Sequence, residues 1–434
     1  MLTVASALAI LWLLVLPPVR PALGQATPPR ALPQPNPTDQ LIQFHQGKVA
    51  QDPDDFLAYN RLGAAYIQKA RETGDITYYR LTEQAVQKSL ALVPHGPAAA
   101  AAITSLAIVE IARHRFAEAL AAAQRAVELG GGQPSPHAIV ADAYLELGEY
   151  DKAGLALSRL LGVSAPLRPH SRLAHLQFLK GDARGGIDHM RRAVGAAIEA
   201  NAPKENLAWS HVELGQLYFQ GGDLARADRS HQDALATFPG YHRARAGLAR
   251  VRAAQGKYEE AIDLYRKAIG VIPLPEYAAA LGDVYGKTGR ADDARRQYQL
   301  VEYIGYLNAL NKVVYNRELA LFYADHDLKL PEALALAEKE LEVRRDIYTW
   351  DVLAWARLKN GKPQEALAAM TEALKLGTRD ARLFFHAGLI HRHLRQPERA
   401  REYLQRALSL NRHFHPIQGD VAARVLAELQ GRAR

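Results

Sequence analysis

The sequence predicts an all-α protein, a solenoid built from about ten helix-turn-helix units, and three observations predict it. First, alanine is abundant and runs of β-branched residues are scarce, which favours helix over strand. Second, a turn glycine recurs at steps of 33, 41, 34, 33 and 72 residues, the last step being two units of 36. These glycines are Gly148, Gly181, Gly222, Gly256, Gly289 and Gly361. A period near 34 residues with two amphipathic helices per unit is typical of a helical repeat array.

The third observation is a pair of small-residue positions in the same register. Seven residues before each turn the chain carries Gly63, Ala107, Ala141, Ala174, Gly215, Ala249, Gly282, Ala320, Ala354 and Gly388. Five residues beyond each turn it carries Ala119, Ala153, Gly186, Ala227, Ala261, Ala294, Ala333, Ala366 and Ala400. Small side chains at these positions let the two helices of a unit cross closely.

The chain opens with an apolar stretch, residues 2–16, that two prolines end. Small residues follow, so residues 1–24 are predicted to be a signal peptide cleaved after Gly24, with cleavage after Ala26 as the rival. This predicts a periplasmic or secreted protein. No Lys or Arg precedes the apolar run, so an inner-membrane anchor formed by residues 2–16 is the alternative, and it would hold the chain near a membrane. The run is short for this, because a spanning helix needs about 20 residues.

Residues 25–40 are rich in proline and poor in large apolar side chains. Such a segment cannot build a core, so we expect an extended linker. The solenoid is expected to occupy residues 41–434.

The repeated units resemble tetratricopeptide (TPR) repeats. The unit "HVELGQLYFQGGDLARADRSHQDALATFP" carries the family's small, aromatic and proline positions at Leu214, Gly215, Tyr218, Ala227, Ala234 and Pro239. About ten such units cover residues 55–412. The resemblance implies a right-handed helical solenoid whose first helices line a concave groove that receives a peptide or a partner protein.

Three units depart from the regular spacing. The first has about seven extra residues in "QKARETGDITYYR", a similar excess surrounds Asn201, and about four extra residues fall in the tyrosine-rich insertion at 298–315. After Pro416, an amphipathic pattern of Val421, Val425, Leu426 and Leu429 predicts a final helix. That helix would cover the exposed core of the last unit, as solenoid ends require.

Several chemistries find no support in the sequence. The chain has no cysteine, and its net charge of +8 is spread out rather than gathered in a basic block, so no nucleic-acid partner is predicted. The segment from Gly282 to Thr288 resembles a phosphate-binding loop, but it is one residue short and lies in a helix rather than after a strand. His413 and His415 could share a metal, but the sequence offers no third ligand. We therefore predict no metal, no cofactor and no enzymatic activity.

The helical register also predicts which side chains face the groove. Counting positions three and four apart on the first helices gives Arg168, His175, Phe178, Trp209, Gln216, Phe219, Arg243, Arg250, Asp283, Trp355 and Arg392. Aromatic residues and arginine are common in binding hot spots. The groove is therefore expected to be aromatic and basic in its first half, with an acidic step near Asp283.

These inferences favour a non-enzymatic protein–protein interaction scaffold of the cell envelope. The alternative is a carrier or chaperone for a small ligand or a metal, which would use the histidines and the tyrosine-rich insertion.

The small-residue register makes one stability prediction. Replacing Ala261 with isoleucine should lower the free energy of unfolding by about 1–3 kcal/mol, because the added methyl groups would overpack the helix crossing. Urea unfolding followed by circular dichroism measures this, and an unchanged midpoint would contradict the assigned register.

Overall fold

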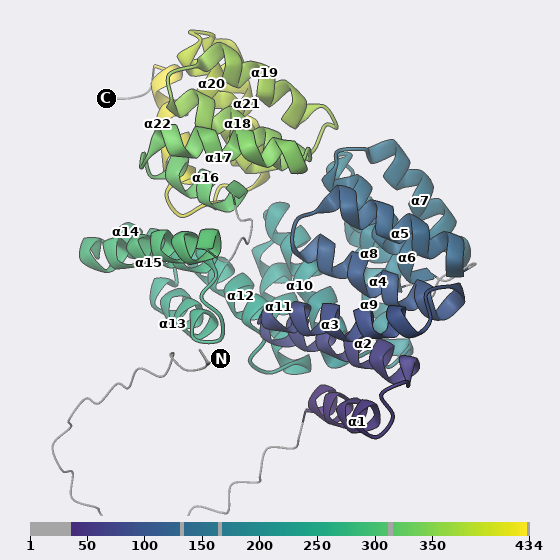
Figure 1. The fold of residues 1–434 in the computed structure, drawn as a ribbon. Coiled ribbons are helices and arrows are strands. Elements are labelled where there is room, and N and C mark those ends of the chain that lie inside the picture. Colours follow the sequence, from purple (N-terminus) through teal and green to yellow (C-terminus); the bar gives the residue numbers. More distant parts are fainter. Residues whose placement is uncertain (1–35, 131–133, 164–166, 311–315, 432–434) are drawn as a thin grey trace, which may run out of the picture.

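The structure is a computed structural model that describes residues 36–130, 134–163, 167–310 and 316–431. Every regular element in these ranges is an α-helix (Figure 1). The first eleven are α1 Pro37–Gln51, α2 Phe56–Thr73, α3 Thr77–Leu92, α4 Gly96–Ala112, α5 Phe116–Gly130, α6 Pro134–Glu146, α7 Tyr150–Val163, α8 Leu167–Leu179, α9 Ala183–Glu199, α10 Lys204–Gln220 and α11 Leu224–Thr237. The others are α12 His242–Ala254, α13 Tyr258–Ile269, α14 Pro275–Lys287, α15 Ala291–Leu310, α16 Asn316–Asp325, α17 Leu330–Val343, α18 Ile347–Lys359, α19 Pro363–Leu374, α20 Ala381–His393, α21 Pro397–Leu410 and α22 Gln418–Leu429.

The helices pair into ten helix-turn-helix units, from unit 1 (α2 and α3) to unit 10 (α20 and α21), which confirms the predicted solenoid. One further helix, α1, precedes unit 1, and α22 follows unit 10. Residues 37–40, which we expected in the linker, belong to α1, where the Asn36 side chain accepts a hydrogen bond from the first turn. The expected signal peptide and residues 25–35 of the linker lie outside the described residues. Among the helices described, none is long and apolar enough to cross a membrane.

The small residues lie where the two helices of a unit cross. Ala249 and Ala261 are fully buried, and a Cβ added to Gly388 would lie 2.8 Å from Cγ of Leu404 on the second helix. A larger side chain at these positions would push the helices apart. The shared register of the two small-residue sets therefore reflects the crossing itself.

Two of the irregular segments coincide with long helices in the described residues. The extra residues of the first unit extend α2 and α3 to 18 and 16 residues, and the tyrosine-rich insertion extends α15 to 20 residues. On α15, Tyr298 packs against Phe322, but Tyr303 and Tyr306 are exposed. The insertion therefore does more than fill internal space.

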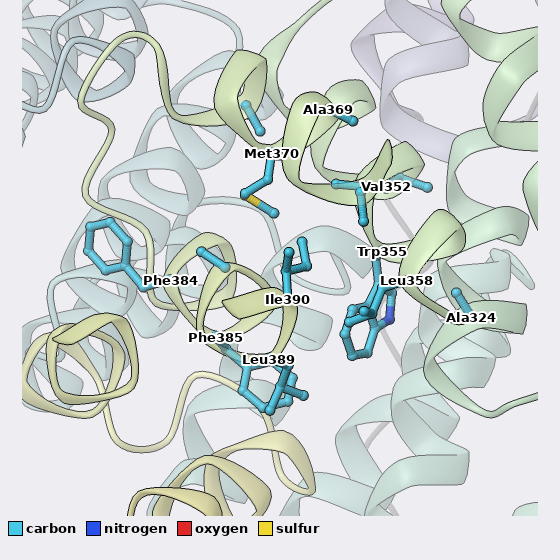
Figure 2. Close-up of a cluster of buried hydrophobic side chains, with 14 of the residues drawn as sticks. Ala324, Val352, Trp355, Leu358, Ala369, Met370, Phe384, Phe385, Leu389 and Ile390 are labelled. Atoms are coloured by element: carbon cyan, nitrogen blue, oxygen red, sulfur yellow. The ribbon is translucent and has the colours of Figure 1, made fainter. Parts of the chain in front are cut away.

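The predicted capping helix is present. In α22, Ala422 and Val425 are buried in a hydrophobic cluster that they share with α18, α19 and α20. Figure 2 shows part of this cluster, with Met370 and Ile390 pointing toward one another from neighbouring units. The last unit is therefore not left with an open apolar face.

Successive turns of the superhelix touch each other. The turn inside unit 4 meets the loop that follows unit 9, where a Cβ on Gly181 would lie 2.5 Å from the carbonyl oxygen of Gly377. The turn inside unit 5 meets the loop that follows unit 10, where a Cβ on Gly222 would lie 2.6 Å from the carbonyl oxygen of Leu410. The turn inside unit 3 meets the loop that follows unit 8, where a Cβ on Gly148 would overlap the carbonyl oxygen of Arg345. Figure 1 shows the resulting arrangement, with the green and yellow helices beside the blue ones.

Hydrogen bonds across these contacts cap the C-terminal ends of α6, α8 and α10. The donor and acceptor pairs are Arg345 N to Glu146 O, Thr378 Oγ1 to Leu179 O, and Asn411 Nδ2 to Phe219 O. Carbonyls at the end of a helix have no partner within that helix. The later superhelical turn therefore supplies donors that the earlier one lacks.

An ion-pair network reinforces the contact between units 3 and 8. Arg344 Nη2 lies 2.5 Å from Glu146 Oε2, and Arg344 Nε lies 2.8 Å from Asp346 Oδ2. Arg317 Nη1 lies 2.9 Å from the same Asp346 oxygen. Arg344 and Asp346 are both buried, and replacing Arg344 would take the cation away from Glu146 and leave Asp346 with Arg317 as its ion-pair partner.

The turn glycines allow this contact to be tested with a matched pair of variants. Gly181 and Gly256 both have positive φ, +82° and +76°, but nothing lies within 4 Å of a Cβ on Gly256. Each alanine substitution should cost about 1–2 kcal/mol for the left-handed backbone. Gly181→Ala should cost about 1–3 kcal/mol more, because it also forces the two superhelical turns apart.

Thermal melting and small-angle scattering measure the two effects. Gly181→Ala should melt lower than Gly256→Ala and have a larger radius of gyration. Equal melting temperatures and equal radii for the two variants would show that the contact contributes nothing.

Candidate functional site

The superhelix encloses a cavity of about 1070 Å³, which we call the chamber. Its wall is formed mainly by the first helices of the units, together with the segment Asn411–Pro416 that precedes α22. Eight of the eleven residues predicted to face the groove line this chamber. They are His175, Phe178, Trp209, Gln216, Phe219, Arg243, Arg250 and Asp283.

Helical spacing explains why these side chains converge. Trp209 and Gln216 on α10 are seven residues apart, as are Arg243 and Arg250 on α12. Seven residues are nearly two helical turns, so each pair shares one face. Because consecutive first helices pack side by side, their inner faces form one continuous wall.

Trp355 does not line the chamber, and the prediction for it was wrong. Its side chain is only 4% exposed, stacks on His386 and donates from Nε1 to Asp325 Oδ1 at 2.8 Å. Figure 2 shows Trp355 among the buried side chains of the C-terminal cluster. Gln418, at the start of α22, donates to the same Asp325 oxygen. The C-terminal segment therefore covers the helix face that carries Trp355, which the helical register had predicted to face the groove.

Arg392 also lies away from the chamber, in an ion pair with Glu428 of α22 at 2.7 Å. Here too the capping helix supplies a partner that the repeat pattern does not reveal. The side chain of the remaining predicted residue, Arg168, lies outside the described ones.

The chamber is mixed in charge rather than basic. Its lining includes six arginines and eight Asp or Glu residues. Several arginines are neutralised across the wall, as in the ion pair of Arg71 with Glu205 at 3.0 Å, which joins unit 1 to unit 5. The lining up to residue 250 holds four of the arginines and three of the acids, so the first half of the chamber is only weakly basic, and the excess of acids lies in the second half.

Arg250 is held in place by its neighbours. Its guanidinium lies over the ring of Phe219, 4.1 Å from the centroid, and donates a hydrogen bond to Gln216. Burial lowers the pKa of Arg250, and the charge of Arg382 adds to this effect. Two guanidinium groups from units 6 and 10 thus act on each other across the chamber.

Asp283 connects three parts of the chain at the acidic end of the chamber. It accepts from Tyr298 at 2.9 Å and pairs with Nε2 of His326 at 2.8 Å and Nε2 of His415 at 3.1 Å. Burial alone would raise the pKa of Asp283, but the hydrogen bonds and charges of the two histidines outweigh it and hold that pKa well below its usual range. Burial also works against protonation of His326, yet the Asp283 carboxylate raises the pKa of that imidazole.

Sequence reasoning missed the contribution of the C-terminal segment to the wall. Phe414, His415 and Pro416 line the chamber, but no repeat position marks them, because they lie beyond the last unit. The sequence indicates His413 and His415 only as possible metal ligands. Among the described residues, no group of three or more His, Cys, Asp or Glu side chains is placed to hold a metal ion.

Comparison with known proteins finds a repeat family that matches three stretches of the chain. A family model described as a tetratricopeptide repeat matches residues 104–171, 212–278 and 352–413. A search of curated proteins finds no match.

Several solved structures are similar to this chain at low identity and low TM-score. They include the APC/C hetero-tetramer Cut9–Hcn1, at 14% identity over 91% of this chain and 96% of that one, with a TM-score of 0.33. A tetratricopeptide repeat protein from Parabacteroides merdae ATCC 43184 is 17% identical over 62% and 100% of the two chains, with a TM-score of 0.35. MamA is 17% identical over 38% and 93%, with a TM-score of 0.30. These likenesses are too distant to bear on what this chain binds.

The Asp283 cluster predicts a pH-dependent contribution to stability. Folding lowers the pKa of Asp283, so the stability that its ionised carboxylate contributes is fully present above 3.8, the pKa of this group in the unfolded chain. Folding raises the pKa of His326, so the stability that its protonated imidazole contributes is fully present below pH 6.5, the pKa of this group in the unfolded chain. This contribution is lost as the pH rises through the pKa of His326 in the folded chain. Asp283→Asn should therefore cost about 3 kcal/mol at about pH 6 and less at about pH 8.5.

Thermal melting at the two pH values measures this difference, with Asp263→Asn as the control. Asp263 is 58% exposed in its ion pair with Lys267, so its loss should change little at either pH. A destabilisation by Asp283→Asn that is independent of pH would contradict the charged pairing with His326.

Proposed function

This chain is built from tetratricopeptide repeats, and on that premise we propose that it is a non-enzymatic protein–protein interaction scaffold. The partner contributes an extended peptide segment, and that segment lies inside the chamber. The chain has no catalytic role in this proposal. Its N-terminal residues 1–24 direct it to the cell envelope, where it acts as a periplasmic or secreted protein.

The observation that carries the proposal is the convergence of eight predicted side chains on one chamber. Trp209 offers partly exposed aromatic surface in a wall backed by the buried rings of Phe178 and Phe219, and Arg243 and Arg250 offer charged donors. This is the composition of binding hot spots, in which a few aromatic and arginine side chains carry most of the affinity. A chamber of about 1070 Å³ also exceeds most pockets for small ligands, which favours a peptide over a small molecule.

The proposal is tested by photo-crosslinking in the native host. A photoreactive amino acid replaces Trp209 inside the chamber, and in a second variant it replaces Arg295, which is 68% exposed on α15. The Trp209 variant should crosslink to one continuous segment of a partner protein, and the Arg295 variant should not. Crosslinks to that partner only from Arg295 would place the binding surface outside the chamber.

Charge reversal in the chamber should weaken binding of the partner identified in this way. Arg243→Glu combined with Arg250→Glu should lower the affinity by about tenfold or more, because it replaces two donors by repelling charges. Arg392→Glu is the matched control, since Arg392 lies on the outer surface against Glu428 and its reversal should leave affinity unchanged.

Isothermal titration calorimetry measures the affinities, and circular dichroism checks that both variants remain helical. Equal affinity of the double variant and the wild-type protein would remove the chamber arginines from the binding site.

A further inference from the structure

Three charged side chains inside the chamber have no side-chain partner among the residues that the structure describes. They are Glu213 on α10, Arg243 on α12 and Glu276 on α14, and they come from the consecutive units 5, 6 and 7. Within the described part of the chain, none of them makes a hydrogen bond or an ion pair with another side chain. Arg243 and Glu276 are open to solvent inside the chamber, and Glu213 is half-buried.

Other arginines of the chamber are satisfied by the protein itself. Arg71 pairs with Glu205 and Arg317 pairs with Asp346. These pairs join units or superhelical turns, so their role is explained by the fold. Glu213, Arg243 and Glu276, in contrast, connect no two parts of the described chain, and all three line the chamber.

The surroundings disfavour the charged forms of the two carboxylates, Glu213 and Glu276. Burial, together with the nearby charge of Glu318, raises the pKa of Glu276 to about 7, although a hydrogen bond from its own backbone and the charge of Arg243 oppose the shift. Burial also raises the pKa of Glu213, against the charges of Arg243 and His175. Both carboxylates therefore lie where a cation would stabilise their charged form, and among the described residues no cationic side chain is close enough to form an ion pair with either of them.

The order of the three charges along the solenoid is acidic, basic, acidic. Neighbouring helices pack with their axes roughly 8–10 Å apart. An extended chain advances about 3.3 Å per residue, so one unit corresponds to about three residues of a bound peptide. Because the order is symmetric, the complementary order in the peptide is the same for either chain direction.

We propose that the chamber recognises an extended peptide segment carrying basic, acidic and basic side chains at intervals of about three residues. The basic side chains pair with Glu213 and Glu276, and the central acidic one pairs with Arg243. Trp209, one helical turn before Glu213, offers an aromatic face to the adjacent basic group. This inference rests on the proposed peptide-binding function and names the chemistry of the partner segment.

The test uses three labelled fifteen-residue peptides with the full chain. The first has arginine at its fourth and tenth positions and aspartate at its seventh, in a glycine and serine background that stays extended. The second has the same composition, with aspartate moved to the fourth position and arginine at the seventh and tenth. The third has the reversed order, with arginine at the seventh position and aspartate at the fourth and tenth.

Fluorescence anisotropy at fixed salt should show the wild-type chain binding the first peptide about tenfold more tightly than the second. The triple variant Glu213→Lys, Arg243→Glu, Glu276→Lys should instead prefer the third peptide. Equal binding of the first two peptides, or no binding of any of them, would overturn the inference.

A milder variant guards against loss of the fold in the triple variant. Arg243→Gln removes only the central charge, and it should reduce the affinity for the first peptide to that for the second. If it leaves the preference for the first peptide unchanged, the assignment to Arg243 is wrong. A partner segment crosslinked from Trp209 that lacks this charge order would overturn the inference while leaving the scaffold function in place.

Discussion

The close crossing of two helices in every unit is the constraint on which the rest of this structure depends. Small residues such as Ala249 and Gly388 bring the second helix against the first. Repeated ten times, this crossing curves the array until later units meet earlier ones. The curvature creates the contacts at Gly181 and Gly222, and those contacts in turn enclose the chamber. A local packing rule thus determines both the shape and the interior surface of the molecule.

The unit could be predicted from the sequence because its determinants are local and repeat at a regular period. The closure of the superhelix could not, because it joins residues almost 200 positions apart that share no pattern. Gly181 and Gly256 occupy the same place in their units and look alike in the sequence, yet only Gly181 meets another part of the chain. The placement of Trp355 failed for a related reason, since the segment that covers it lies beyond the repeats.

Charge has two distinct roles in the interior. Buried pairs such as Arg344 with Glu146 hold neighbouring superhelical turns together and are complete without a ligand. Glu213, Arg243 and Glu276 are open to the chamber and incomplete. A count of charges over the whole chain, which is positive, does not reveal this division. Helical register predicted that Arg243 would face inward, but only the surrounding wall shows which inward charges are already neutralised.

The contacts between superhelical turns also bear on how such a chain can change its length during evolution. Open repeat arrays gain and lose whole units easily, because each unit contacts only its neighbours. Here the turn of one unit meets the loop that follows the fifth unit after it. Duplicating or deleting one unit between units 3 and 8 would move Arg344 away from Glu146 and break the ion pair that joins the two superhelical turns. The number of internal units is therefore fixed by closure, and growth by duplication is confined to the two ends.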